Sequence, residues 1–152
     1  RTRKRNYIST SSAKKNLGGG VLNDLSHEID YANFIFGSLK RVFKFHEKIS
    51  NLKINTEDYA VILCRSNKTK ILIMLDYIST KSKRLIKINF KNFTVEADLI
   101  KNVIFIYSLN KKTKKVFKYN DTYSEQLKCL IKNKFELFCD IRQAKKVLNI
   151  IH

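Results

Sequence analysis

The sequence contains no proline and no tryptophan, and only four of its 152 residues are glycine. Three of those glycines are consecutive, at Gly18, Gly19 and Gly20, so the turns that need glycine are concentrated at one place. No apolar run reaches the roughly 18 residues that a membrane-spanning helix needs. The basic start of the chain is not followed by the apolar segment of a signal peptide. We therefore expect one folded domain without a membrane segment.

Cysteine is also scarce. Cys64, Cys129 and Cys139 lie far apart, and an odd number of cysteines at such spacings favours neither a disulfide framework nor a zinc site. Cys64 and Cys129 fall in apolar patterns that are typical of small, buried, reduced side chains. We expect no metal site and a reducing, cytoplasmic setting.

Acidic residues are few, since 13 Asp and Glu stand against 31 Lys and Arg, and the formal net charge is +18. Such an excess can indicate nucleic acid or an anionic surface as a partner. An AT-rich genome explains the excess of basic residues equally. Lys, Asn, Ile, Phe and Tyr have AT-rich codons and are abundant here, whereas proline has GC-rich codons and is absent. The lysines are spread over expected strands and turns, and no aromatic run or GXXG loop typical of RNA-binding domains is present. We therefore expect no nucleic-acid partner, and keep a basic nucleic-acid-binding module as the alternative.

The order of periodic patterns predicts the fold class. Residues 21–36 have apolar side chains at helical spacing, and Gly37 is a natural helix end. Strand-like alternation follows as far as residue 119, and helical spacing returns afterwards, with Asp140 as the expected N-cap of a last helix. This order predicts an α+β domain: an open, mostly antiparallel sheet of about six strands with helices on one face. Residues 1–16 are expected to form a basic arm or linker, and residues 17–152 the domain.

A carboxylate and an imidazole follow the glycines. Asp24, His27 and Asp30 are three residues apart, which makes them neighbours on a helix. A neutral histidine can accept the proton of a hydroxyl group while a carboxylate orients it, so Asp24 and His27 suit carbinol–carbonyl interconversion. A surface or capping pair is the alternative, and no further His or Cys cluster supports metal binding. Lys14 and Lys15 precede the glycines, where they either face an anion or stay solvated.

This stretch resembles the start of the C-terminal domain of the Gfo/Idh/MocA oxidoreductases, the family of glucose–fructose oxidoreductase and inositol dehydrogenase. The resemblance runs through residues 12–15, 17–22, 24–31 and 35–37, and continues in looser form through residues 57–60, 93–99 and 140–148. It therefore covers nearly the whole chain.

The resemblance implies that the cofactor and the substrate are bound by different domains. Members of this family bind NAD or NADP on an N-terminal Rossmann domain, and their C-terminal domain shapes the substrate site and commonly mediates oligomer contacts. The motif's histidine corresponds to His27, as acid/base on the substrate hydroxyl, and its aspartate to Asp24, as partner. Lys14, Lys15 and Asp30 are expected to contact substrate. The resemblance thus implies an NAD(P)-dependent oxidoreductase acting on a sugar, sugar nucleotide or cyclitol, with a homo-oligomer formed through the open sheet face.

Two departures from the family pattern matter. The commoner pattern is D-x-G-x-H, whereas Asp24 and His27 form D-x-x-H, which resembles a subgroup often associated with sugar modification for surface polysaccharides. The Rossmann domain is also absent from this sequence, so we expect a fragment that is inactive alone. A non-catalytic scaffold of the same family remains a further alternative.

Val103, Phe105 and Tyr107 suggest an apolar sheet face that a second subunit would cover.

Overall fold

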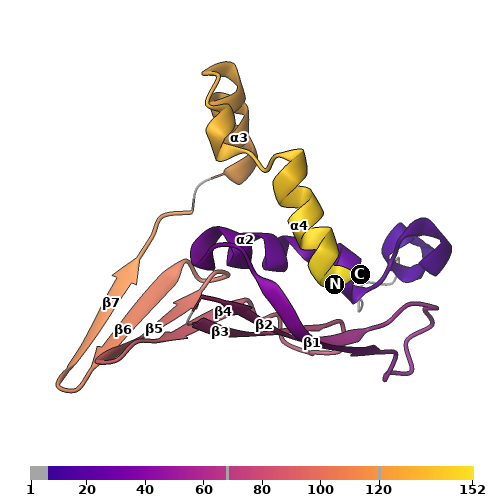
Figure 1. Ribbon diagram of the computed structural model, residues 1–152, viewed down its shortest axis with the longest axis horizontal. Coiled ribbons are helices and arrows are strands. Elements are labelled where there is room, and N and C mark those ends of the chain that lie inside the picture. The colour runs from indigo at the N-terminus through magenta and orange to yellow at the C-terminus, as the bar shows by residue number, and fades with distance from the viewer. Residues whose placement is uncertain (1–6, 68, 120) are drawn as a thin grey trace. The chain divides into compact units, whose positions relative to one another are not determined.

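The computed structural model describes residues 7–67, 69–119 and 121–152 (Figure 1). It divides the chain into two compact units, Arg1–Ile78 with Cys139–His152, and Ser79–Phe138. Each unit contains one open antiparallel sheet, and together with the helices these sheets confirm the α+β class. The strands form two sheets, of three and four strands, where the sequence predicted one sheet of about six. No helix among the described residues is long and apolar enough to cross a membrane.

The sheet of the first unit consists of β1 (Lys40–Glu47), β2 (Tyr59–Ser66) and β3 (Thr69–Asp76), in the order β1-β2-β3. Successive side chains of a strand point to opposite faces. The inner face is buried and includes Ala60, Ile62 and Cys64, which are fully inaccessible to solvent. This confirms Cys64 as a core residue.

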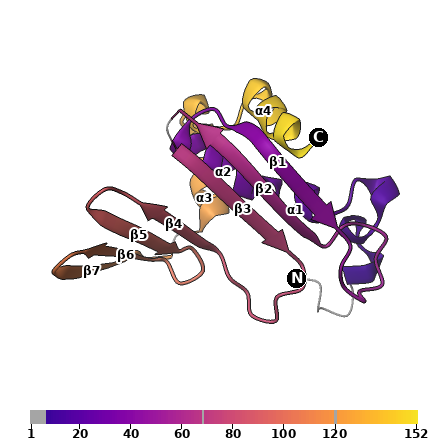
Figure 2. The same ribbon diagram turned by 60° about the horizontal axis from the view of Figure 1, so that its bottom comes forward.

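Three helices cover the inner face. They are α1 (Val21–Asp24), α2 (Ser26–Phe36) and α4 (Ile141–Ile151), and Figures 1 and 2 show α2 and α4 on the same side of this sheet. Val21, Ile29 and Ile151 are buried in one cluster with the inner-face residues. The single helix expected over residues 21–36 is wrong, because the chain leaves the helical path at Leu25, where α1 ends and α2 begins.

Two capping arrangements hold α4. At its start, Asp140 accepts a hydrogen bond from the Gln143 backbone N–H, and the Gln143 side chain accepts one from the Asp140 N–H, which confirms the expected N-cap. At its end, Arg41 of β1 donates to the carbonyl of Ile150 at 2.8 Å. A cation beside the last carbonyls of a helix is favourable, so this end of α4 is tied to the sheet edge.

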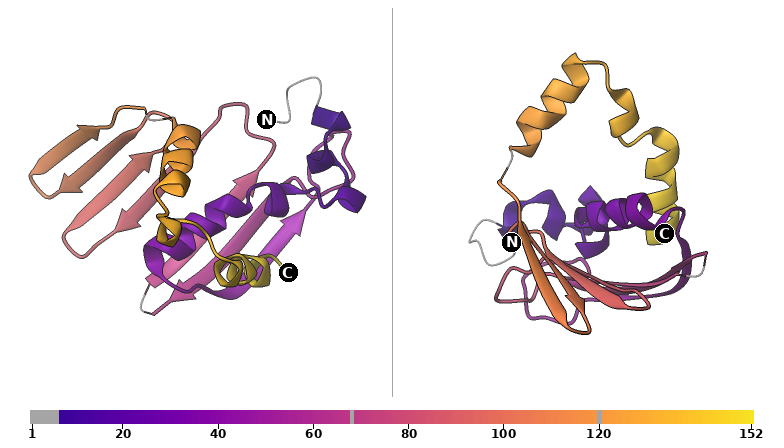
Figure 3. Two further views of the ribbon diagram at one scale, coloured as in Figure 1. Left: turned by 90° about the horizontal axis from the view of Figure 1, so that it is seen from above. Right: turned by 90° about the vertical axis from the view of Figure 1, so that its left-hand side faces the viewer.

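The second unit consists of β4 (Leu85–Asn89), β5 (Phe93–Asp98), β6 (Val103–Ser108) and β7 (Lys111–Val116), followed by α3 (Thr122–Ile131) and the 3₁₀ turn η4 (Phe135–Leu137). The four strands pair in chain order as an open meander, visible in Figure 3. On one face of this sheet the Lys112 ammonium lies over the rings of Phe105 and Tyr107, at 4.9 and 5.2 Å.

The described part of the expected arm packs against the first unit. It forms the 3₁₀ turns η1 (Tyr7–Ser9), η2 (Ser11–Ala13) and η3 (Lys15–Leu17), in which Tyr7 and Ala13 are buried. The Tyr7 ring meets Tyr77 edge to face, with 5.3 Å between centroids. Residues 1–6 of the arm lie outside the described residues.

Candidate functional site

The three glycines form a tight turn that carries the chain from η3 into α1. Gly18 and Gly20 have φ values of 74° and 119°, which favour glycine. Gly19 is required for a different reason, because a Cβ on it would lie 2.4 Å from the Ser11 carbonyl oxygen. The backbone N–H of Gly20 donates to the carbonyl of Ser12 at 3.0 Å. The turn is therefore packed against Ser11 and Ser12 and does not form an open anion-binding loop.

Glu57 accepts hydrogen bonds from the first N–H groups of α1. Its backbone carbonyl accepts from the Val21 N–H at 3.1 Å, and its carboxylate accepts from the Leu22 N–H at 3.3 Å. The first N–H groups of α1 are thus bonded to oxygen atoms of Glu57. The Lys14 and Lys15 side chains are exposed.

Asp24 turns toward the N-terminal segment and the core. Its carboxylate accepts a hydrogen bond from the Ser12 hydroxyl at 3.0 Å. Burial, the Tyr7 hydroxyl and the Asp24 carboxylate all raise the pKa of Tyr77 above its ordinary value. Asp24 therefore ties η2 to α1 beside a pair of buried phenols.

His27 lies in the first turn of α2, and half of its side chain is exposed. Its Nε2 lies 3.1 Å from the Glu28 carboxylate, a side chain that is only 12% exposed. The carboxylate that meets the imidazole is thus Glu28 and not Asp24. Sequence reasoning missed Glu28, because adjacent residues on a helix do not normally face each other.

Asp30 lies one helical turn beyond His27 and meets the segment that leads into α4. The Cys139 thiol is 3.7 Å from the Asp30 carboxylate. Partial burial of Cys139 and the negative charge of Asp30 raise the pKa of that thiol. Among the described residues, no three His, Cys, Asp or Glu side chains converge as a metal site.

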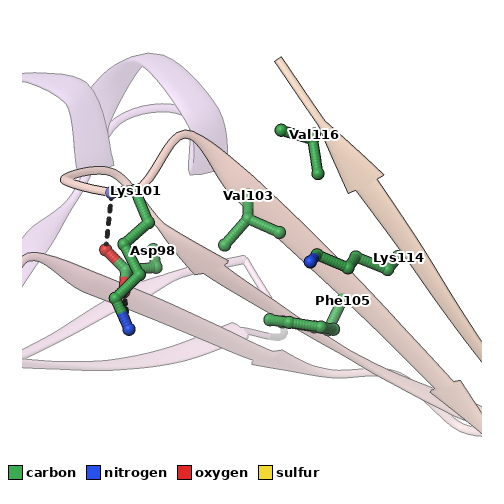
Figure 4. Close-up of a pocket in the computed structure, with 6 residues that line it drawn as sticks. All are labelled: Asp98, Lys101, Val103, Phe105, Lys114 and Val116. Atoms are coloured by element: carbon green, nitrogen blue, oxygen red, sulfur yellow. Dashed lines mark hydrogen bonds and ion pairs between the residues drawn. The ribbon is translucent and has the colours of Figure 1, made fainter. Parts of the chain in front are cut away.

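Two hollows are lined by other residues. One, of about 280 Å³, is lined on the second unit's sheet by the six residues of Figure 4: Asp98, Lys101, Val103, Phe105, Lys114 and Val116. Within it the Lys101 ammonium is 3.7 Å from the Asp98 carboxylate, so these two charges offset each other. The other, of about 350 Å³, lies at one end of the β1–β3 sheet. Neither is lined by His27, Asp24 or Asp30.

No protein-family model matches this sequence, and no curated protein matches it. Solved structures do match. UDP-N-acetylglucosamine 3-dehydrogenase GnnA from Acidithiobacillus ferrooxidans aligns with a TM-score of 0.71 at 17% identity, over 86% of this chain and 44% of that chain. KijD10, a 3-ketoreductase from Actinomadura kijaniata in complex with NADP and TDP-benzene, aligns with a TM-score of 0.74 at 11% identity, over 95% and 47%.

A third match is a putative NADPH-dependent oxidoreductase from Desulfitobacterium hafniense, with a TM-score of 0.76 and 14% identity over 93% of this chain and 47% of that chain. Identities this low show a shared fold. The chain spans less than half the length of each of these structures. It therefore has the fold of about half of an oxidoreductase chain, in agreement with the fold that the sequence resemblance implied.

Proposed function

We propose that this chain is the substrate-side domain of an NAD(P)-dependent oxidoreductase of the Gfo/Idh/MocA family, acting on a hydroxyl or carbonyl group of a sugar nucleotide. The observation that carries the proposal is a half-exposed imidazole, paired with a carboxylate, on a fold shared with a UDP-N-acetylglucosamine dehydrogenase and a 3-ketoreductase crystallised with NADP. More than half of each of those chains lies outside the match, which is room for a nucleotide-binding domain.

The diphosphate of a dinucleotide does not fit the glycine turn before α1. A diphosphate on a glycine-rich turn needs the free N–H groups of a helix start. Here Glu57 already accepts from the Val21 and Leu22 N–H groups, and the turn packs on Ser11 and Ser12. We therefore place NAD or NADP, and the hydride chemistry it supplies, on a part of the protein outside this sequence.

In this proposal His27 handles the proton. The neutral imidazole accepts the proton of the substrate hydroxyl as the carbinol is oxidised, and the imidazolium returns it to the carbonyl oxygen in the reverse direction. Glu28, at 3.1 Å, stabilises the imidazolium. Glu28 thus takes the partner role first assigned to Asp24, which holds η2 against α1 instead.

The remaining residues keep supporting roles. We propose that Lys14 and Lys15, exposed before the glycine turn, approach an anionic group of the substrate. We propose that Asp30, one helical turn along from His27, contacts the substrate as well. Use of the product in surface polysaccharide synthesis, a cytoplasmic location and a homo-oligomer through an open sheet face belong to the same proposal.

The test uses the complete protein. It is incubated with NADH or NADPH, and with NAD or NADP, together with a panel of UDP- and TDP-linked sugars and their 3-keto forms. We expect oxidation or reduction of the pyridine nucleotide with at least one member. Sugar-nucleotide binding without any turnover across the panel would instead identify a non-catalytic scaffold.

A further inference from the structure

The hollow at one end of the β1–β3 sheet is lined by a row of cations. Strand pairing places Lys40 of β1 next to Arg65 of β2, and Arg65 next to Lys70 of β3. Side chains of directly paired residues lie on the same face of a sheet. These three exposed residues (the basic row) line the hollow of about 350 Å³ together with Ser38, Ser66 and Asn67. Three positive charges from adjacent strands therefore share one open hollow.

The part of the chain that the structure describes does not neutralise the basic row. None of its three members forms an ion pair with a described residue, and none of the six residues that line the hollow is acidic. On the same face, Glu47 and Asp76 pair with Tyr59. Tyr59 is six residues from Arg65 along β2, about 20 Å in an extended strand, or on the order of two Debye lengths at 0.1 M salt. Those carboxylates are therefore too far along the sheet to balance the charge of the hollow.

The end of α2 lies beside the hollow but leaves it positive. The Ser66 hydroxyl donates to the carbonyl of Phe36, the last residue of α2, at 2.6 Å. Its proton is therefore already used, and the guanidinium and ammonium groups of the basic row are the donors that remain for a ligand. The end of a helix carries only about half a negative charge. Like charges directly opposite one another on paired strands repel, so an anion between them would relieve this repulsion.

We propose that this hollow binds the phosphate or diphosphate group of a small soluble molecule. Arg65 is the middle member of the basic row, and a planar guanidinium can donate to two phosphate oxygens at once. Lys40 and Lys70 add a compact positive charge on each side. A phosphate monoester carries about 1.5 to 2 negative charges at pH 7, so a diphosphate matches the three cations more closely. The volume of the hollow lies near the lower end of the range for small-molecule sites, about 300–1,000 Å³.

The charge pattern of the sheet face favours a compact anion over an extended one. Exposed apolar side chains, among them Leu72 and Met74, follow the basic row along β3, and Asp76 lies beyond them. A nucleic-acid backbone or an anionic membrane laid along this face would come close to Asp76 and Glu47 and be repelled by them. A single phosphate or diphosphate group at the basic end avoids both carboxylates.

Lysine footprinting tests the site in the complete protein. A bulk binding measurement would not locate the anion, because NAD or NADP is proposed to bind elsewhere in that protein. The protein is acetylated with N-hydroxysuccinimidyl acetate at increasing concentrations of sodium pyrophosphate, with the ionic strength held constant by NaCl. Mass spectrometry then gives the acetylation rate of Lys40 and Lys70. Lys111 and Lys115, exposed on the equally basic strand β7, are the internal controls for a loose atmosphere of ions.

Pyrophosphate should slow the acetylation of Lys40 and Lys70 by about threefold or more, because a bound anion keeps each ammonium in its charged, unreactive form. The two control lysines on β7 should react at an unchanged rate. Arg65→Ala should raise the concentration needed for half protection about tenfold, because the bidentate contact is lost. Arg142→Ala, which removes an exposed guanidinium from α4, should leave that concentration unchanged. Circular dichroism checks that both variants fold.

Three results would overturn the proposal. Equal protection of all four lysines would show a loose atmosphere of ions, and protection that survives Arg65→Ala unchanged would show that the basic row does not hold the anion. Protection by vesicles that contain phosphatidic acid, without protection by soluble pyrophosphate, would assign the site to a lipid headgroup instead. The measurement involves neither turnover nor His27, so failure of this site and failure of the proposed activity are distinguishable.

Discussion

Substituting alanine for each glycine of the turn should separate backbone strain from steric conflict. A Cβ at position 20 would lie 2.2 Å from the Glu57 Oε1, and φ there is +119°. With φ 119° and ψ 155°, Gly20 lies in a backbone region that is essentially restricted to glycine and costs an alanine about 1–3 kcal/mol. Displacing the Glu57 carboxylate removes a cap worth about 0.5–2 kcal/mol. Gly20→Ala should therefore destabilise the chain by about 2–4 kcal/mol.

Gly18 supplies the matched control. Its φ is +74°, yet nothing lies within 4 Å of a Cβ built there. Gly18→Ala should cost only the backbone strain, about 1–2 kcal/mol. The assay is equilibrium urea unfolding followed by circular dichroism, with ΔΔG taken at unchanged m-value.

A double-mutant cycle with Glu57→Ala isolates the steric part. In the Glu57→Ala background the Gly20→Ala cost should fall to the backbone strain of position 20 alone, about 1–3 kcal/mol, because the clashing carboxylate is gone. Equal costs at positions 18 and 20 in the natural background, or no recovery in the cycle, would refute the packing of Glu57 on the glycine turn.

Two further predictions concern the first unit. Asp58 is fully buried and accepts hydrogen bonds from the Ile49 N–H at 2.8 Å, the Ser50 N–H and the Ser50 hydroxyl. Asp58→Ala should lower the free energy of unfolding in urea by about 3 kcal/mol, because these donors lose a charged acceptor. A loss below about 1 kcal/mol would contradict this. Burial and the Asp30 charge raise the pKa of Cys139 and so lower its thiolate fraction below that of an ordinary cysteine. Asp30→Asn should therefore lower that pKa and increase the rate of Cys139 alkylation by iodoacetamide at pH 8 severalfold, measured by mass spectrometry. An unchanged rate would show that Asp30 does not act on the thiol.

Local patterns predicted the parts of the fold that local interactions determine. Asp140 was identifiable as an N-cap because its partner Gln143 is three residues away. The alternation over residues 93–98 identified a strand, which the structure has as β5. Alternation reveals the two faces of a strand but not its neighbours, so the separation of the strands into two sheets could not be read from it.

The candidate site depends on contacts that spacing does not encode. Glu57 reaches the start of α1 from 35 residues away. The break at Leu25 involves neither proline nor glycine, and it separates Asp24 from the helix that carries His27. Once the helix breaks there, three-residue spacing no longer pairs the two side chains, and Glu28 becomes the carboxylate beside the imidazole.

The central claim is that His27 carries the proton of a sugar hydroxyl, and single-turnover hydride transfer in the complete protein tests it most directly. His27→Ala should slow transfer by about 10²-fold or more, whereas His46→Ala, an exposed histidine on β1, should leave it unchanged. Sugar-nucleotide affinity is measured alongside and should change little. Near-normal transfer in His27→Ala would contradict the account.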